Sequence, residues 1–525
     1  MAFSATTNVV DVRLWSLIWK PLRFTALQAS LSTLLTLFVG VPAAAVMARY
    51  KFPGKGWLRI LSTLPFILPT VVVAAGFNAL LGPRGWVNVG AMALFALERP
   101  PIQFVNSLGA ILLAHVFYNT TIVLRVVGSA WSQLDTRLAD SARTLGATPW
   151  QALWRVTLPL LRQPILAATA LVFLFNFTSF GVILLLGGPG YMTLEVEIAT
   201  RALNLLDLRA AAALSLVQLL CTLMITLAYQ RVSRGRVIPL TPRLSSEGSR
   251  KPASWQERLW VALVIMGLII LLVTPLLALT VRSFVKLEPD RGERNGFSPQ
   301  ITTAYYQEIF SNRRQSIFFV PPVRAVVNSI LFASSVVLIS LLLGMITTYR
   351  LRGRGWMKRM FDVMVMLPLG TSAVTLGLGF ILVFNQPGAG AGKGIWLIPL
   401  AHSLVAFPFV VRTLQPAIAS IPPQLKQAAA VLGASPWQVW RQVELPILAR
   451  AASISAIFAF TISMGEFGAT TFLARPEFPT LPVAIYRFLS LPGGLNYGQA
   501  MAMATILLMI CAVGIALLEW LERRA

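Results

Sequence analysis

LADSARTLGATPWQALWRVTLPLL, residues 138–161, recurs 287 residues later as LKQAAAVLGASPWQVWRQVELPIL, residues 425–448. The two copies align without a gap and are identical at twelve of twenty-four positions. Each copy predicts a helix, a tight turn and a second helix. Gly146 and Gly433 stand at the end of the first helix, where a left-handed cap favours a residue without a Cβ. The stretch is therefore predicted to be a repeated helical hairpin.

The second helix of each hairpin carries a strong start signal. A hydroxyl residue stands at the N-cap, a proline at N1 and a glutamine at N3: Thr148, Pro149 and Gln151 in one copy, Ser435, Pro436 and Gln438 in the other. This pattern is a capping box with proline at the position where its missing N–H costs nothing. Pro159 and Pro446 are predicted to end the second helix, because proline cannot donate to the helical ladder.

The hairpins are polar and lie between long apolar segments, so they are predicted to be structured loops outside the bilayer. Both also carry large apolar side chains on the short second helix, namely Trp150, Leu153, Trp154, Trp437 and Trp440. An exposed apolar patch of this kind commonly marks a surface for a partner. The alternative is an ordinary amphipathic hairpin that rests on the membrane surface.

These stretches resemble the EAA loop of permease subunits of ATP-binding-cassette (ABC) importers, in which a short coupling helix docks on the ATPase subunit. Asp140-Ser141-Ala142 and Gln427-Ala428-Ala429 take the E-A-A positions, and Leu158-Pro159 and Leu445-Pro446 match the family's ending. The family glutamate is replaced in both copies: Asp140 keeps the charge, and Gln427 keeps only the hydrogen-bonding capacity. The resemblance assigns coupling to the ATPase to Asp140, Ala142, Gly146, Thr148, Trp150, Pro159, Gln427, Ala429, Gly433, Ser435, Trp437 and Pro446.

Composition places the chain in a membrane. Of its 525 residues 56% are hydrophobic and 12% are charged, and the mean hydropathy is +0.72. Soluble proteins carry about 25% charged residues. The net charge of +25 is not a nucleic-acid signature, because the basic residues cluster in short loops between apolar segments, as the positive-inside rule expects.

We predict an all-α polytopic membrane protein made of two homologous, parallel helix bundles with about eleven spans, since one span needs about 20 apolar residues. The predicted spans are 23–48, 59–81, 104–128, 164–187, 208–230, 259–281, 324–349, 360–384, 396–416, 450–473 and 496–519. The predicted domains are an interfacial segment 1–22, a first bundle 23–230 with its coupling loop at 137–161, a basic cytoplasmic linker 231–258, and a second bundle 259–525 with its coupling loop at 424–448.

The halves match beyond the hairpins. The offset of 287 residues also relates His115 to His402 and Phe180-Gly181 to Phe467-Gly468, whereas Gly54 and Gly353 begin a related motif at a slightly larger offset. Basic residues flank equivalent turns in the two halves and are frequent in the linker. A single order of membrane crossings places these basic segments and both hairpins in the cytoplasm, and it places the N-terminus outside. The repeat is therefore parallel, unlike the inverted repeats of many secondary transporters.

Few residues within the spans could carry chemistry. Glu466 is predicted either to line the solute pathway or to make a hydrogen bond that packs the bundle, and its counterpart is Ser179. Ser179 and Asn176 are further pathway candidates, and the favoured alternative for Asn176 is a hydrogen bond that packs helices. His115 and His402 suggest a shared structural hydrogen bond rather than a metal site, because neither is accompanied by further ligands. No metal site and no catalytic residue is predicted.

The glycine-rich segment 388–394 does not make a phosphate loop, since Pro387 replaces the first glycine and Gly394 the Ser or Thr that would hold Mg²⁺. The chain is thus predicted to be a transport subunit without its own ATPase site. ATP and Mg²⁺ would bind a partner, and no cofactor would bind this chain.

The resemblance implies the fused permease of a type I ABC importer in the inner membrane, served by two copies of a cytoplasmic ATPase and an external solute-binding protein. Within the family, Leu-Gly-Gly-Pro-Gly before Thr193-Leu194-Glu195, together with Arg209-Ala210-Ala211, resembles thiamine importer permeases, and ferric-iron importers come next. Sulfate and molybdate types are further off. The alternatives from other classes are an ion-coupled secondary transporter and an intramembrane enzyme; the first predicts inverted repeats and several buried acids, the second clustered His, Asp or Cys.

Overall fold

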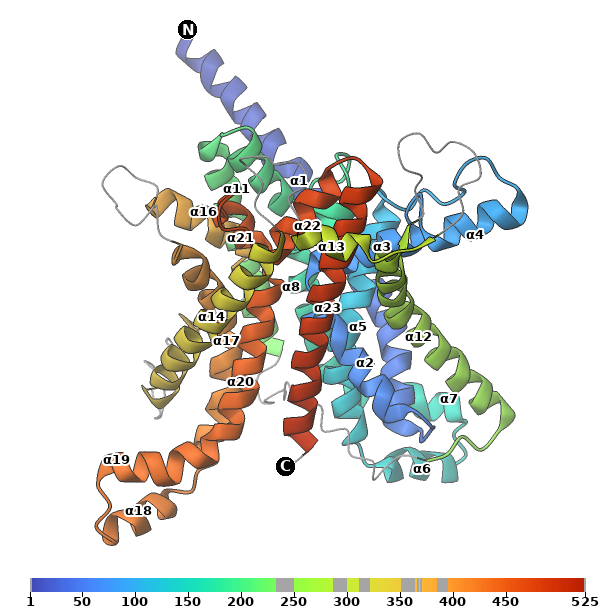
Figure 1. Cartoon of the computed structure of the whole chain (residues 1–525). Coiled ribbons are helices and arrows are strands. Elements are labelled where there is room, and N and C mark those ends of the chain that lie inside the picture. The colour runs from blue at the N-terminus through green and yellow to red at the C-terminus, as the bar shows by residue number, and fades with distance from the viewer. Residues whose placement is uncertain are drawn as a thin grey trace. The chain divides into compact units, whose positions relative to one another are not determined.

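The computed structural model of the chain describes residues 2–232, 250–286, 300–310, 322–350, 364–365, 368, 371–384 and 395–523. It divides into two compact units, residues 1–66 with 73–281 and residues 67–72 with 282–525. Each unit is helical (Figure 1) and is described by itself.

The helices numbered α1 to α12, with two π-helical turns, form the first unit except at its boundaries. They are α1 (Ala2–Arg49), α2 (Lys55–Ile67), α3 (Thr70–Leu81), α4 (Trp86–Phe95), α5 (Leu108–Ser132), α6 (Thr136–Thr144), α7 (Pro149–Ala152), η1 (Leu153–Thr157), α8 (Leu158–Phe177), α9 (Gly181–Leu186), α10 (Leu194–Ala199), η2 (Thr200–Asn204), α11 (Leu208–Val232) and α12 (Trp255–Phe284).

The second unit follows the same plan. Its elements are β1 (Val285–Lys286), β2 (Gln300–Ile301), α13 (Ala304–Phe310), α14 (Pro322–Arg350), α16 (Ala373–Phe384), α17 (Leu397–Ala419), α18 (Pro423–Val431), α19 (Pro436–Val439), η4 (Trp440–Glu444), α20 (Leu445–Gly465), α21 (Gly468–Leu473), α22 (Leu481–Ser490) and α23 (Gly494–Arg523). The two strands pair antiparallel, with Val285 opposite Ile301.

A three-helix core recurs in both units. In the first, α1 and α8 pack against α5 and against each other; in the second, the equivalent helices α14, α17 and α20 do the same. Small and β-branched side chains fill the second core, where Val336, Ala406, Val410, Leu414 and Ala459 are fully buried. The outer faces of α1 and α14 stay apolar and exposed, as expected of helices that face lipid rather than water.

Among the described residues, eight helices are long and apolar enough to cross a membrane, and two bent pairs raise the number to ten. This confirms the predicted polytopic all-α fold. Three predicted spans, 59–81, 164–187 and 450–473, are wrong in one respect. They break at residues 68–69, 178–180 and 466–467, and each continues as a second, shorter helix. The predicted span 360–384 lies partly outside the described residues, and its described end is α16.

Two segments differ from the sequence-based division. Residues 2–22 are not a separate element but the beginning of α1, which runs unbroken to Arg49. Most of α12, which the repeat leaves without a counterpart, belongs to the compact first unit. There it approaches α3 so closely that a Cβ on Gly76 would lie 2.9 Å from the carbonyl oxygen of Pro275.

Close helix contact at Gly40 generates a test of the core. A Cβ there would lie 2.7 Å from Cβ of Val123, where α1 meets α5. We expect Gly40→Leu to lower stability by about 1–3 kcal/mol through overpacking. Gly267→Leu on α12 is the control, because no atom lies within 4 Å of its ideal Cβ. Thermal unfolding of both variants in detergent makes the measurement, and equal stability of the two would contradict the close packing.

Candidate functional site

The first hairpin comprises α6, the turn 145–148 and α7; the second comprises α18, the turn 432–435 and α19. Both turns are closed by the same backbone bonds. Gly146 has φ +92° and Gly433 has φ +82°, as the sequence predicts for a left-handed cap. The Gly146 N–H donates to the Arg143 carbonyl (3.0 Å) and the Ala147 N–H to Ala142 (3.0 Å), the pattern of a Schellman cap.

The second turn repeats this cap, with Gly433 donating to Ala430 (3.0 Å) and Ala434 to Ala429 (3.1 Å). Ala142 and Ala429, the last residues of the E-A-A positions, thus supply the carbonyl that closes each turn. Asp140 and Gln427 lie on exposed surface of α6 and α18. The hairpins therefore match at the backbone although their acidic position differs.

Both predicted capping boxes are present. Thr148 Oγ1 accepts from the Gln151 N–H (3.2 Å), and Gln151 Oε1 accepts from the Thr148 N–H (2.9 Å). In the second hairpin the bond from Gln438 N–H to Ser435 Oγ is 3.3 Å and the bond from Ser435 N–H to Gln438 Oε1 is 2.8 Å. These reciprocal bonds fix the direction in which α7 and α19 leave their turns.

Each hairpin exposes apolar side chains at its tip and on its second helix. Leu145 and Leu432 at the turns are 89% and 88% exposed, and Trp150 and Trp437 are 66% and 63% exposed. A second indole packs on each of these tryptophans, but it comes from a different position of the repeat. Trp154 meets Trp150 edge-on with ring centroids 5.6 Å apart, whereas Trp440 stacks on Trp437 with centroids 4.8 Å apart. The apolar surface common to both hairpins thus includes the leucine at the turn and the tryptophan of the second helix, together with exposed Leu138 or Leu425 on the first helix.

The prediction that Pro159 and Pro446 end the second helix is wrong. A π-helical turn follows α7 and α19, closed by bonds from Leu158 N–H to Leu153 and from Leu445 N–H to Trp440, and the helix then continues as α8 or α20. Each proline falls at the start of that continuation. The extra residue of the π-turn already interrupts the regular ladder there, so the missing N–H is tolerated. Figure 1 shows α19 continuing toward α20.

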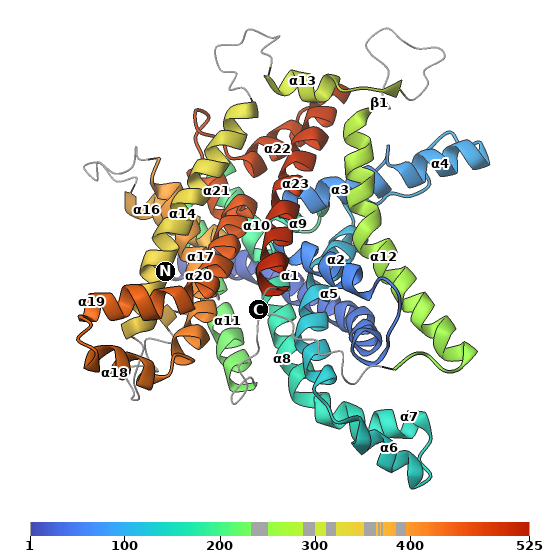
Figure 2. The same cartoon turned by 60° about the horizontal axis from the view of Figure 1, so that its bottom comes forward.

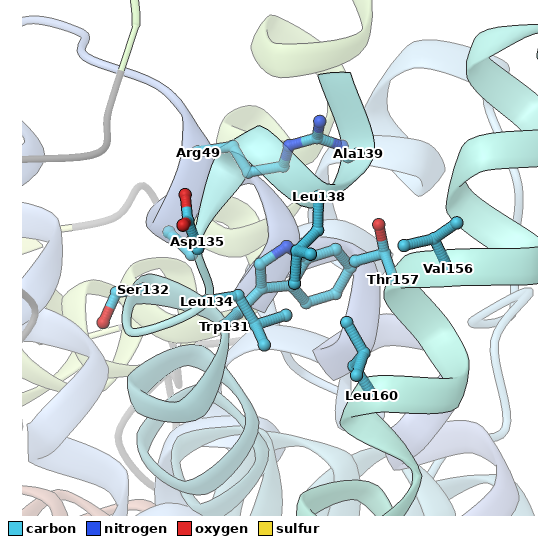
Figure 3. Close-up of a pocket in the computed structure, with 11 residues that line it drawn as sticks. Arg49, Trp131, Ser132, Leu134, Asp135, Leu138, Ala139, Val156, Thr157 and Leu160 are labelled. Atoms are coloured by element: carbon cyan, nitrogen blue, oxygen red, sulfur yellow. The ribbon is translucent and has the colours of Figure 1, made fainter. Parts of the chain in front are cut away.

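The hairpins lie at the basic ends of their own units. In the first unit Arg49, at the end of α1, lines a pocket with residues of α6 and η1 (Figure 3). In the second, Tyr349, which precedes Arg350 at the end of α14, donates to Glu444 of η4 (2.7 Å). Figure 2 shows α6 and α7 beyond the end of α8. Within each unit, hairpin and basic turn thus share one end, as the positive-inside rule requires of cytoplasmic loops.

Each of the two buried histidines bonds to a hydroxyl on both ring nitrogens, although the partners lie at different positions of the repeat. His115 Nδ1 lies 2.9 Å from Ser32 Oγ, and its Nε2 lies 2.8 Å from Ser179 Oγ. His402 Nδ1 lies 2.9 Å from Ser463 Oγ, and its Nε2 lies 2.7 Å from Thr470 Oγ1. The predicted structural role of both histidines is confirmed, and Ser179 of the pathway candidates belongs to such a contact.

Glu466 is buried at the break after α20, and its carboxylate caps the helix that follows. It accepts the N–H groups of Ala469 (2.8 Å) and Thr470 (3.0 Å) and the Thr470 hydroxyl (2.6 Å), and lies 3.1 Å from His402 Nε2. These four partners within the second unit satisfy the hydrogen-bonding capacity of the Glu466 carboxylate. The geometry favours the packing interpretation; a place in the pathway stays a prediction.

Asn176 also holds helices together. Its Oδ1 accepts from Asn119 Nδ2 (2.7 Å), its Nδ2 donates to Thr33 Oγ1 (3.3 Å), and its carbonyl accepts from Gln28 Nε2 (2.8 Å), so α1, α5 and α8 meet at one amide. The sequence analysis missed Gln28 and Thr33, and likewise the fully buried pair of Glu195 and Gln218 (2.8 Å). Their only signal was a polar residue within an apolar run.

No group of three or more His, Cys, Asp or Glu side chains that could hold a metal occurs in the described ranges. The fold and these sites together define a class: a multi-pass transport protein of the membrane, built from two like units that each carry a capped hairpin.

Comparison with known proteins gives the family. Residues 40–237 and 340–525 match the family described as "Binding-protein-dependent transport system inner membrane component", and the chain belongs to it. It is 28% identical over 517 residues to the thiamine transport system permease protein ThiP of Escherichia coli, with 98% of this chain and 91% of the relative covered. ThiP of Haemophilus influenzae is 27% identical (93% and 85% covered), and the probable ABC transporter permease protein y4fN of Sinorhizobium fredii is 27% identical (92% and 82% covered).

The role of Glu466 is testable by stability. Glu466→Ala leaves two backbone N–H groups, a hydroxyl and His402 without their acceptor, so we expect a loss of about 3 kcal/mol or more. Ser179→Ala, at the equivalent position, removes a neutral hydrogen bond and should cost about 1 kcal/mol. Thermal unfolding in detergent compares the two. If Glu466→Ala kept full stability but lost transport, the carboxylate would belong to the pathway instead.

Proposed function

We propose that this ABC importer permease of the inner membrane carries thiamine, that two copies of a cytoplasmic ATPase dock on its two hairpins, and that an external binding protein delivers the solute. The observation that carries the coupling part is the pair of hairpins with identical backbone caps, each exposing a leucine at its turn and a tryptophan on its second helix. Because both hairpins present the same apolar residues at the same positions, one kind of cleft on an ATPase subunit can bind either hairpin.

Force transmission follows from helix continuity. The capped helix α7 passes through η1 into α8, and α19 passes through η4 into α20, with no loop between the docking surface and the membrane span. The first of these paths bends by 66° between Pro149–Leu160 and Arg162–Phe177. Each hairpin is closed by backbone and capping bonds, so it moves as a body when its tip is displaced. Closure of the ATPases on ATP would therefore reach the helices of the three-helix core through α8 and α20. This continuity supports a lever-like coupling helix.

ATP and Mg²⁺ are assigned to the ATPase partner. The segment 388–394 lies outside the described residues, and its sequence lacks the hydroxyl residue that holds Mg²⁺ in a phosphate loop. This chain's own residues supply docking surfaces and spans, not a nucleotide site.

Thiamine is preferred to ferric iron because the relatives from E. coli and H. influenzae are named as thiamine transport permeases and align over nearly the whole chain. The local resemblance around Thr193-Leu194-Glu195 points the same way. The ion-coupled secondary transporter, considered from the sequence as an alternative, gains no support from the family match.

Uptake tests the substrate. We expect cells that rely on this transporter to accumulate labelled thiamine, and deletion of the chain to abolish that uptake. Labelled ferric iron is the parallel substrate, and its uptake should not change. Loss of iron uptake with normal thiamine uptake would reverse the assignment.

The lever idea has its own test at the left-handed glycines. Gly146→Pro combined with Gly433→Pro should abolish transport while the protein still inserts, because proline fixes φ near −65° and removes the N–H that closes each turn. Gly146→Asn with Gly433→Asn is the control, since asparagine tolerates the left-handed region. Transport is measured at matched membrane abundance. Normal uptake by the proline double variant would refute a rigid coupling hairpin.

A further inference from the structure

The second hairpin is joined to its bundle by a buried carboxylate. Glu444, in η4, is 5% exposed. One of its oxygens pairs with the ammonium group of Lys426 on α18, and the other accepts the hydroxyl of Tyr349 at the end of α14 (2.7 Å). The carboxylate therefore links the outer helix of the hairpin, the π-turn and a core span.

The first hairpin has none of these groups at the matching positions. The offset of 287 residues puts Ala139 opposite Lys426 and Thr157 opposite Glu444. Thr157 Oγ1 bonds within its own helix, to the Ala152 carbonyl (3.4 Å). Tyr50, which matches Tyr349 in the register of the Gly54 and Gly353 motifs, lies instead beneath the Arg250 guanidinium, 5.5 Å from its ring centre.

A pocket occupies the corresponding place in the first unit. It lies between α6, η1 and the ends of α1 and α5, and Ala139 and Thr157 both line it. Figure 3 shows Leu138, Thr157 and Leu160 around the indole of Trp131 at its floor. The second unit has an ion pair from α18 to η4 and a hydrogen bond from η4 to α14. At the matching positions the first unit has Ala139 and Thr157, which line a pocket.

We propose that Glu444, with Lys426 and Tyr349, is a positioning residue that locks the second coupling hairpin to its bundle, and that the first hairpin is free to tilt over its pocket. A buried carboxylate bonded to a cation and a phenol resists separation, because parting them strands a charge in a poorly solvated site. Ala139 and Thr157, at the matching positions beside the pocket, carry no charge that would resist separation in this way. The docking surfaces of the two hairpins are alike, and their anchors to the bundles differ.

The consequence for transport, which rests on the proposed function, is that the two hairpins transmit the displacement of their ATPases unequally to their bundles. The second hairpin passes the displacement of its ATPase to α14 and α20 at once. The first takes up part of that displacement by closing its pocket. One chain thus carries a stiff coupling hairpin and a compliant one. The two can differ because the halves of the fused chain have diverged in sequence.

Matched spin labels at the hairpin tips test the difference directly. Leu145→Cys and Leu432→Cys place a label at equivalent, equally exposed turn positions. They are made in the full chain with Cys221→Ala and Cys511→Ala and placed in lipid nanodiscs without any partner. Paramagnetic resonance spectra then report the mobility of each hairpin. We expect the label at 432 to be the more immobile of the two.

Three variants identify the cause. Glu444→Gln, Lys426→Met and Tyr349→Phe should each raise mobility at position 432 and leave position 145 unchanged. Each loses a hydrogen bond or ion pair to a charged group, so the detached population should rise about tenfold or more. The exchange Lys426→Glu with Glu444→Lys should restore immobility. Equal mobility at the two tips, no response at 432, or an equal gain at both positions would overturn the proposal.

These spectra are independent of substrate and ATPase, so they separate this proposal from the proposed function. If the chain failed to transport thiamine, the difference between the tips would still hold. If the tips proved equal, thiamine uptake and ATPase docking would still stand.

Discussion

The left-handed backbone at Gly146 and Gly433 is the constraint on which the rest of the arrangement depends. A helix can end, turn and restart within four residues only if its last carbonyls find donors, and here the N–H groups of the glycine and of the alanine after it supply them. A side chain at φ near +90° is strained, so glycine is the residue that permits this turn. The reciprocal capping box then sets the direction of the next helix. In the second hairpin that helix runs through the π-turn as one span, Pro436–Gly465, whereas in the first it bends by 66° between Pro149–Leu160 and Arg162–Phe177.

Within the spans, polar groups serve packing in both units. A histidine in the second helix of each core bonds on both ring nitrogens to hydroxyls, and Asn176 joins three helices at one amide. In the bilayer core no water is present to hydrogen-bond a polar side chain, so such groups bond to neighbouring helices. The halves have diverged in how they do this: Glu466 caps a short helix where the first half has Ser179. The two units keep one plan while their polar contacts differ.

Local chemistry was predictable from the sequence, and long-range pairing was not. The caps at Gly146 and Thr148, the apolar hairpin tips and the equivalent histidines all follow from residue types a few positions apart. The continuation of the helix past Pro159 did not, because a proline at the start of a helix and a proline that ends one look alike without the preceding π-turn. Glu444 was missed for a different reason: it reads as one acid on a polar loop, and its partner Tyr349 lies on another helix. The breaks at residues 178–180 and at Glu466 were hidden because apolar residues continue on both sides of them.

The central claim is that both hairpins face the cytoplasm and receive the same kind of ATPase. The most direct measurement is the reaction of single cysteines at positions 145 and 432 with a membrane-impermeant maleimide, in right-side-out cells and in inverted vesicles, with and without the ATPase bound. Both cysteines should react only in inverted vesicles, and bound ATPase should protect both. Reaction of either cysteine from the outside, or full reaction of both in the presence of bound ATPase, would contradict the claim.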